Sequence, residues 1–303
     1  SRWDAAQTLF SRKVEQAISK DTTVELDEQT VTSCRNLLLG NSDPALIALA
    51  LTLPTPATIA ENFSVIPVER INENLDALKQ KLAEALKEDF ISVYYKCATQ
   101  HPYELSAQDI AARQLKKTCL SYLALTSNSD ELLEQEFNQA DNLTDQLAAL
   151  QAAVWSNHSL ANTLLEAFDK QWREEKLVMD KWFSTQAIAN NEATVERLIE
   201  LMSHPDFSIK NPNRVYSLLA AFTQNQAQFH RADGKGYQLV AEQIKVLNDF
   251  NPQVASRLVS AFVSWRRYDE KRQELMKAEL KGIQYLPNLA SDLFEKVESC
   301  LTE

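Results

Sequence analysis

Hydrophobic residues recur at intervals of three and four positions along most of this 303-residue chain. Near the N-terminus, Trp3, Phe10, Val14 and Ala17 follow this spacing, which places them on one face of an amphipathic helix. Short polar segments interrupt the pattern at regular intervals, and it then resumes with the same period. The pattern predicts a chain of amphipathic helices joined by short loops.

One periodic run is longer than the others. It extends from Pro67 to Ala98 with apolar residues such as Leu75, Leu82 and Phe90, and it predicts a single helix on the order of 45 Å long. With this rod included, we expect about fifteen helices in all. The other predicted helices lie near residues 1–18, 27–40, 43–53, 55–63, 106–125, 130–140, 144–155, 159–174, 177–189, 193–203, 211–222, 237–250, 251–265, 267–280 and 289–301.

A short internal repeat marks two of these helices. Asn211-Pro212 and Asn251-Pro252 stand forty positions apart, and a Leu, an Ala and a Phe follow in register after each pair. The Asn side chain can accept hydrogen bonds from the free amides of a first helical turn, and Pro fits the next position because no amide hydrogen is needed there. Both pairs therefore predict helix starts. A repeat of this length is typical of HEAT and armadillo stacks.

The glycine content supports the same fold class. The chain contains only four glycines, too few for the tight turns of a protein rich in β-hairpins. We therefore expect an all-α protein, a curved superhelical stack of the HEAT or armadillo kind, that forms a single domain over residues 1–303.

The second Asn-Pro helix is apolar around most of its circumference, so most of it is expected to be buried. Its apolar positions are Val254, Ala255, Leu258, Val259, Ala261, Phe262, Val263 and Trp265. The remaining polar stripe contains Gln253 and Arg257, and the same stripe in the first copy contains Asn213 and Tyr216. Such a stripe either makes polar contacts with a neighbouring element or lines a water-filled cavity. For Arg257 the alternative is a guanidinium that caps a neighbouring helix or pairs with a core carboxylate.

Charge and cysteine content restrict the classes of partner. The net charge of -11 disfavours nucleic acid and anionic membranes, since both require a basic surface. No apolar run is long enough to span a bilayer. The four cysteines are scattered without a C-x-x-C pair, so we expect reduced core thiols in a reducing compartment.

Motifs for catalysis or metal binding are missing from the sequence. None of the four histidines, His101, His158, His204 and His230, has a second His or a Glu at a typical metal-ligand spacing, and H-E-x-x-H does not occur. There is also no G-x-S-x-G motif and no phosphate-binding loop. We therefore expect no metal and no catalytic residue in this chain.

An ordered set of short motifs resembles a known family. The motifs are SRWDAAQ at 1–7, NLTDQLAAL at 142–150, LVMDKWF at 177–183, NPNR at 211–214, NPQVASRL at 251–258 and RYDEKRQE at 267–274. Over essentially its whole length the chain resembles the C-terminal helical domain of bacterial aminopeptidase N, a zinc metallopeptidase.

The resemblance implies an accessory domain of an enzyme that removes N-terminal amino acids from peptides. In that family the zinc ligands belong to a preceding thermolysin-like domain, and the helical domain closes over the active site and lines the peptide chamber. The expected partners are thus the upstream catalytic domain of the same chain and peptide substrates, and the expected location is the cytoplasm. The fragment alone is expected to be inactive.

The resemblance also implies a set of chamber residues. Arg257 stands where the family sends an arginine toward the chamber, and Gln253 precedes it by one helical turn. Tyr216 occupies a position where some relatives have a second arginine, and Asn213 lies on the same stripe. We expect these four residues to contact substrate.

A second class of function remains open from the sequence. A HEAT-like scaffold could bind a protein partner on its concave face. Such a free-standing scaffold should have polar capping helices at both ends, whereas the first helix here carries Trp3 and Phe10 on a broad apolar face. This face favours a chain that continues upstream.

Overall fold

The computed structural model describes residues 2–99 and 101–302, and all regular elements in these ranges are helices. The prediction of an all-α armadillo-like fold is confirmed. The chain groups into two compact units, residues 1–62 with 69–166 and residues 63–68 with 167–303, here called the first and second unit. No helix among the described residues is long and apolar enough to cross a membrane.

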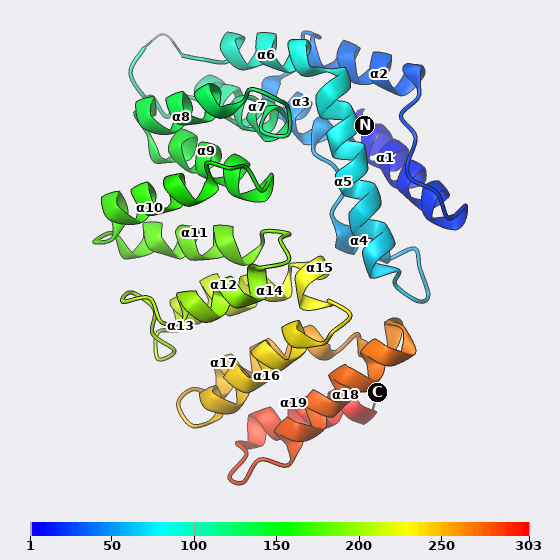
Figure 1. Cartoon of the computed structure of the whole chain (residues 1–303), viewed down its shortest axis with the longest axis vertical. Helices are drawn as coiled ribbons and strands as arrows, with labels where there is room; N and C mark the ends of the chain where they lie inside the picture. The colour runs from blue at the N-terminus through cyan, green and yellow to red at the C-terminus, as the bar shows by residue number, and fades with distance from the viewer. Residues whose placement is uncertain (1, 100, 303) are drawn as a thin grey trace. The chain divides into compact units, whose positions relative to one another are not determined.

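The first unit is organised around α7. Helices α3, α6 and α9 all pack against α7, while α8 pairs with α9 and α1 with α3 (Figure 1). The stacked rings of Phe90 on α6 and Tyr122 on α7 have centroids 4.5 Å apart, and the Tyr122 hydroxyl donates a hydrogen bond to the Leu51 carbonyl oxygen. The helices are α1 (Arg2–Ser19), α2 (Glu28–Leu38), α3 (Pro44–Leu51), α4 (Pro56–Ala60), α5 (Val68–Ala85), α6 (Lys87–Lys96), α7 (Ala107–Leu123), α8 (Asp130–Gln139) and α9 (Leu143–Trp155).

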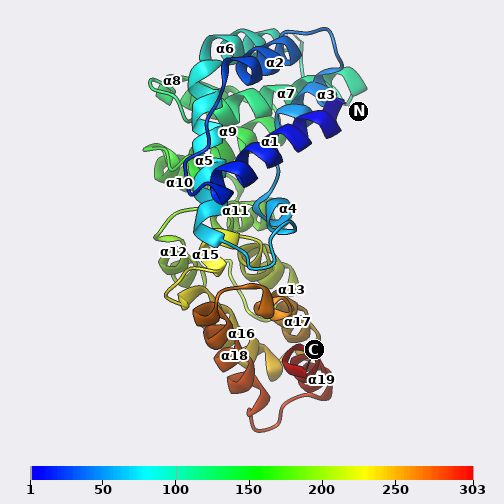
Figure 2. The same ribbon diagram turned by 90° about the vertical axis from the view of Figure 1, so that its right-hand side faces the viewer.

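The second unit contains the two Asn-Pro helices. Helix α16 packs against α12, α17 and α18, and α19 packs against both α17 and α18 (Figure 2). The helices are α11 (Lys176–Ala187), α12 (Thr194–Leu201), α13 (Pro212–Val215), α14 (Ala221–Thr223), α15 (Gln226–Phe229), α16 (Lys235–Asn248), α17 (Pro252–Val259), α18 (Glu270–Gln284) and α19 (Ser291–Thr302). Helix α10 (Ala161–Trp172) contributes its first residues to the first unit and the rest to the second.

Helix starts follow the capping residues seen in the sequence. Side chains of Asp27, Asp43, Thr55 and Ser106 accept hydrogen bonds from backbone amides of the first turns of α2, α3, α4 and α7. Pro44 and Pro56 occupy the first helical turn after two of these caps, in the same arrangement that the two Asn-Pro pairs predict. Each cap satisfies an amide that has no partner within the helix.

The predicted single helix from Pro67 to Ala98 is wrong. Helix α5 ends at Ala85 and α6 begins at Lys87, and the intervening Leu86 leaves helical geometry with φ -115° and ψ 17°. Leu86 is fully buried, and the change of direction at this residue lets α6 pack against α7 (Figure 1). Tertiary packing therefore decides where this rod bends.

All four cysteines are buried thiols. Cys34, Cys97 and Cys119 belong to the first unit and Cys300 to the second. Burial raises the pKa of the Cys34 thiol to about 11, and it also raises the pKa of Cys97 and of Cys119. The thiolate, which is the reactive form, is therefore disfavoured at these three positions near neutral pH.

Candidate functional site

The two Asn-Pro helices begin as the repeat predicts. The Asn211 side chain accepts a hydrogen bond of 3.0 Å from the Asn213 amide, and the Asn251 side chain accepts one of 3.3 Å from the Val254 amide. A proline occupies the first turn of each helix. These caps fix the residues at which α13 and α17 begin, and therefore which residues lie on the polar stripe.

The two copies differ beyond their first turns. After α13 the chain forms a π-helix over Tyr216–Ala220, whereas α17 ends at Val259 and tightens into a 3₁₀ turn over Ser260–Phe262. The prediction of a single helix through Trp265 is therefore wrong, because the α-helix ends at Val259. Val263, which was expected to be buried, is 42% exposed. π-Helical turns occur mostly as single turns and are frequent at functional sites.

The first copy borders a surface pocket of about 430 Å³. The pocket lies between α11 and the segment that begins with α13, both of which belong to the second unit. Two of the residues expected in the substrate chamber, Asn213 and Tyr216, line it. The complete lining consists of Leu177, Asp180, Lys181, Ser184, Asn213, Tyr216, Ser217 and Ala221.

Arg257 and Tyr216 are in direct contact. The Arg257 Nη1 donates a hydrogen bond of 2.9 Å to the Tyr216 hydroxyl, and the guanidinium carbon lies 5.7 Å from the centroid of the tyrosine ring. Arg257 is exposed, so the alternative of a buried cap or core ion pair does not describe it. Gln253 is also exposed, one turn earlier on α17, and it is not among the residues that line the pocket.

A different arginine adopts the buried arrangement. Arg214 is only 3% exposed. Its Nε donates to the Asp206 carbonyl oxygen and its Nη1 to the Lys176 carbonyl oxygen, both at 2.9 Å. The same Nη1 forms an ion pair with Asp180, whose Oδ1 lies 3.4 Å from the Ser217 hydroxyl. Asp180 therefore joins the wall of the pocket to the buried guanidinium beneath it.

Sequence reasoning missed Arg214, although the repeat contains the signal. Arg214 aligns with Val254, a buried position of the second copy, and it precedes the buried Leu218 by one helical turn. A charged residue in a buried register predicts a structural ion pair.

One of the four histidines, His101, lies beside two carboxylates. His101 lies in a group with Glu104 and Asp109 in which one potential ligand atom from each residue lies within 4.8 Å of the others. Sequence spacing did not indicate this group, because two of its members lie in the irregular segment before α7, where no helical period applies. Among the other histidines, His158 lies 3.8 Å from Asp130 and His204 lies 3.5 Å from Asp169, while His230 is enclosed by two tyrosines.

Comparison with known proteins relates the whole chain to one family. Residues 1–302 match the family described as "Domain of unknown function (DUF3458_C) ARM repeats". Over 99% of its length the chain is 37% identical to aminopeptidase N of Haemophilus influenzae and 39% identical to aminopeptidase N of Escherichia coli. It is 31% identical to aminopeptidase N of Caulobacter vibrioides over the same share. The chain spans 35% of the length of each of these relatives.

A solved structure agrees with the sequence relatives. The crystal structure of Legionella pneumophila aminopeptidase A in complex with aspartic acid matches 99% of this chain with a TM-score of 0.90 and 31% identity, and the match covers 36% of that protein. The resemblance to the C-terminal helical domain of bacterial aminopeptidase N is thus confirmed. The chain belongs to the DUF3458_C family of ARM-repeat domains, which forms the C-terminal part of aminopeptidase chains.

Proposed function

We propose that this chain is the single accessory C-terminal domain of a zinc aminopeptidase that removes N-terminal amino acids from peptides. Its role is to close over the active site and to line the substrate chamber. The observation that carries this proposal is the match of 99% of the chain to 35% of each aminopeptidase N. The partners are then the upstream catalytic domain of the same chain and peptide substrates, and the role is peptide catabolism in the cytoplasm.

The exposed polar stripe supplies chemistry suited to a peptide. The Arg257 guanidinium carries several donors in a fixed plane, which can meet peptide carbonyl oxygens or a C-terminal carboxylate. The Tyr216 hydroxyl holds one of its nitrogen atoms at 2.9 Å and so limits the orientations that the guanidinium samples. The Asn213 and Gln253 side chains add amide donors and acceptors on the same stripe. These groups would recognise the peptide backbone more than a side chain, so the proposed enzyme would accept a broad range of substrates.

The catalytic metal of such an enzyme would be held outside this chain. No H-E-x-x-H motif is present to supply two histidine ligands and a general base. The isolated chain is therefore expected to release no N-terminal amino acid from peptides such as alanyl p-nitroanilide, with or without added zinc. Chelator-sensitive release by the purified chain would contradict this assignment.

In the full-length enzyme, Arg257→Ala is expected to lower kcat/KM for short peptides by roughly ten- to a hundred-fold. Charge-assisted hydrogen bonds of this kind contribute about 1.5–3 kcal/mol, and their loss appears directly in kcat/KM. The melting temperature should remain nearly unchanged because the side chain is exposed. Steady-state kinetics and thermal melts on the same preparation measure both effects.

The control for this experiment is Arg197→Ala. Arg197 is a partly exposed arginine of α12 in the same unit, paired with Glu200 on its own helix. The Arg197→Ala variant should leave kcat/KM unchanged. If Arg257→Ala lowers the melting temperature but leaves kcat/KM of the folded enzyme intact, Arg257 has a structural role and the chamber assignment fails.

The alternative function, a free-standing scaffold, has weaker support. All three sequence relatives named above are aminopeptidases, and each contains far more chain than the matched part. If the domain only bound a protein partner, Arg257→Ala would leave kcat/KM of the full-length enzyme unchanged. The same kinetic experiment therefore separates the two functions.

A further inference from the structure

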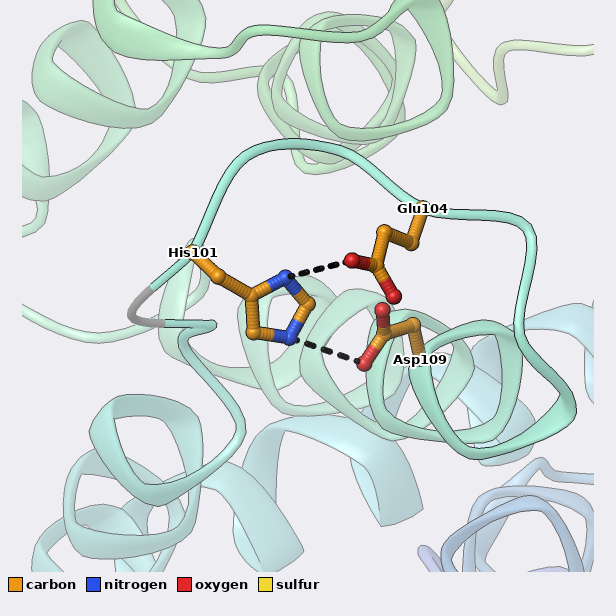
Figure 3. A group of neighbouring side chains, drawn as sticks. All are labelled: His101, Glu104 and Asp109. Carbon is orange, nitrogen blue, oxygen red and sulfur yellow. Dashed lines mark ion pairs between the residues drawn. The ribbon is translucent and has the colours of Figure 1, made fainter.

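The group formed by His101, Glu104 and Asp109 brings one imidazole and two carboxylates together in the first unit (Figure 3). His101 and Glu104 lie in the segment between α6 and α7, and Asp109 lies in the first turn of α7. His101 Nε2 is 3.6 Å from Asp109 Oδ1, and His101 Nδ1 is 4.0 Å from Glu104 Oε1.

The tautomer of His101 follows from its backbone contact. Nδ1 lies 2.9 Å from the Pro102 carbonyl oxygen, which can only accept a hydrogen bond. Nδ1 therefore carries the proton, and in the neutral ring the lone pair of Nε2 faces the Asp109 carboxylate. Metal-binding histidines usually donate their second ring N–H to a carbonyl or a carboxylate in this way, which fixes the orientation of the ring.

Asp109 has an oxygen atom that the described residues leave unsatisfied. The residue is only 7% exposed, and its buried Oδ2 has no hydrogen-bond partner among them. Figure 3 shows this oxygen facing the Glu104 carboxylate, with the other oxygen directed at His101. A buried carboxylate oxygen that faces a second carboxylate requires a cation or a proton, because burial without a partner is costly.

Neighbouring contacts hold the three side chains in place. The Ser106 hydroxyl caps α7 by accepting a hydrogen bond of 3.1 Å from the Asp109 amide. The buried Arg113 donates a hydrogen bond of 3.1 Å to the Glu104 carbonyl oxygen and stacks over the Tyr103 ring. The Tyr103 amide is held in turn by Asp141 Oδ2 at 3.0 Å. The segment is thus anchored between His101 and Asp109.

We propose that His101 Nε2, Asp109 and Glu104 bind a divalent transition-metal ion of the zinc class, with water as the fourth ligand. One imidazole with two carboxylates suits zinc better than calcium or magnesium, which take six or more oxygen ligands. Ligand atoms of a tetrahedral zinc site lie about 3.3 Å apart. In the structure the candidate ligand atoms lie further apart than this, so a side chain must move when the ion binds. Glu104 makes most of this movement, because its side chain is 65% exposed and free to rotate inward.

Isothermal titration of the 303-residue chain with zinc chloride tests the proposal. We expect one zinc per chain, accompanied by a rise in melting temperature. Each of the variants His101→Asn, Glu104→Gln and Asp109→Asn should weaken binding by at least about ten-fold. Glu104→Gln is the decisive variant because the side chain is exposed and its replacement leaves folding intact, which circular dichroism verifies.

The matched control is His158→Asn. His158 Nε2 lies 3.8 Å from Asp130 Oδ1, so it forms a histidine–carboxylate pair without the second carboxylate. This variant should bind zinc as the unmodified chain does. The proposal is overturned if zinc does not bind, or if binding survives in Glu104→Gln and Asp109→Asn. A proton on His101 would then be the cation that faces Asp109.

Discussion

Replacing Arg214 by alanine is expected to lower the free energy of unfolding of the second unit by about 3–5 kcal/mol. The guanidinium is buried, pairs with Asp180 and donates to the carbonyl oxygens of Asp206 and Lys176. Its removal leaves the Asp180 carboxylate without its counter-ion and two carbonyl oxygens without a donor. Urea denaturation followed by circular dichroism measures the loss.

Two further variants separate the ion pair from a general effect of charge. Lys235→Ala removes an exposed cation from its pair with Glu196, and it should cost less than about 1 kcal/mol. Arg214→Leu combined with Asp180→Leu removes both charges and should recover part of the stability lost in Arg214→Ala. A loss in Arg214→Ala no larger than that in Lys235→Ala would show that the buried pair does not hold this region together.

Acidification is expected to destabilise the second unit through His230. The imidazole is 5% exposed, with Nδ1 and Nε2 each 2.9 Å from a tyrosine hydroxyl, of Tyr237 and Tyr268 respectively. Burial, together with the nearby Arg272 guanidinium, lowers the pKa of His230 from 6.5 to about 3. Arg272 also donates a hydrogen bond of 2.6 Å to the His230 carbonyl oxygen.

The direction of the effect follows from proton binding in the two states. Between pH 6.5 and about 3 the unfolded chain protonates His230 while the folded chain does not, so stability falls as the pH falls. At pH 5 the expected loss from this residue is about 2 kcal/mol relative to pH 7.5, because one pKa unit corresponds to about 1.4 kcal/mol. Denaturant titrations at the two pH values measure it.

The matched variant is His230→Gln, which keeps hydrogen-bonding capacity and cannot titrate. It should be less stable at pH 7.5 because packing against Tyr268 is lost. Its stability should nevertheless change by about 2 kcal/mol less between pH 7.5 and 5 than that of the unmodified chain. Equal changes in the two proteins would show that other groups, and not His230, account for the acid sensitivity.

Local rules predicted helix starts well and helix continuity poorly. The caps at Asn211, Asn251 and Ser106 depend on neighbouring residues alone, so the sequence contains all the necessary information. The bend at Leu86 leaves no such trace. The Leu86 amide still bonds the Leu82 carbonyl oxygen at 3.0 Å, and the Phe90 amide bonds the Leu86 carbonyl oxygen at 2.8 Å. The apolar period therefore continues through the bend, which is imposed by packing against other helices.

The two arginines of the Asn-Pro helices show how much of the site could be predicted. The helical wheel placed Arg257 on a polar stripe, and the structure exposes it beside Tyr216. The helical wheel could not show that Asp180, some thirty residues away, would pair with Arg214. Contacts between distant helices depend on how the helices cross, which a single sequence does not encode by spacing. The grouping of His101 with Asp109 was hidden for another reason, because it depends on the path of the irregular segment before α7, which has no helical period.

The buried cysteines give the molecule internal reporters of local opening. Alkylating reagents attack thiolates, and in the folded chain the thiols are shielded from solvent. Three of them belong to the first unit and Cys300 to the second, so a brief pulse of iodoacetamide marks whichever unit has transiently opened. The mass added to each cysteine-containing peptide then measures the opening free energies of the two units separately, in one unmodified molecule.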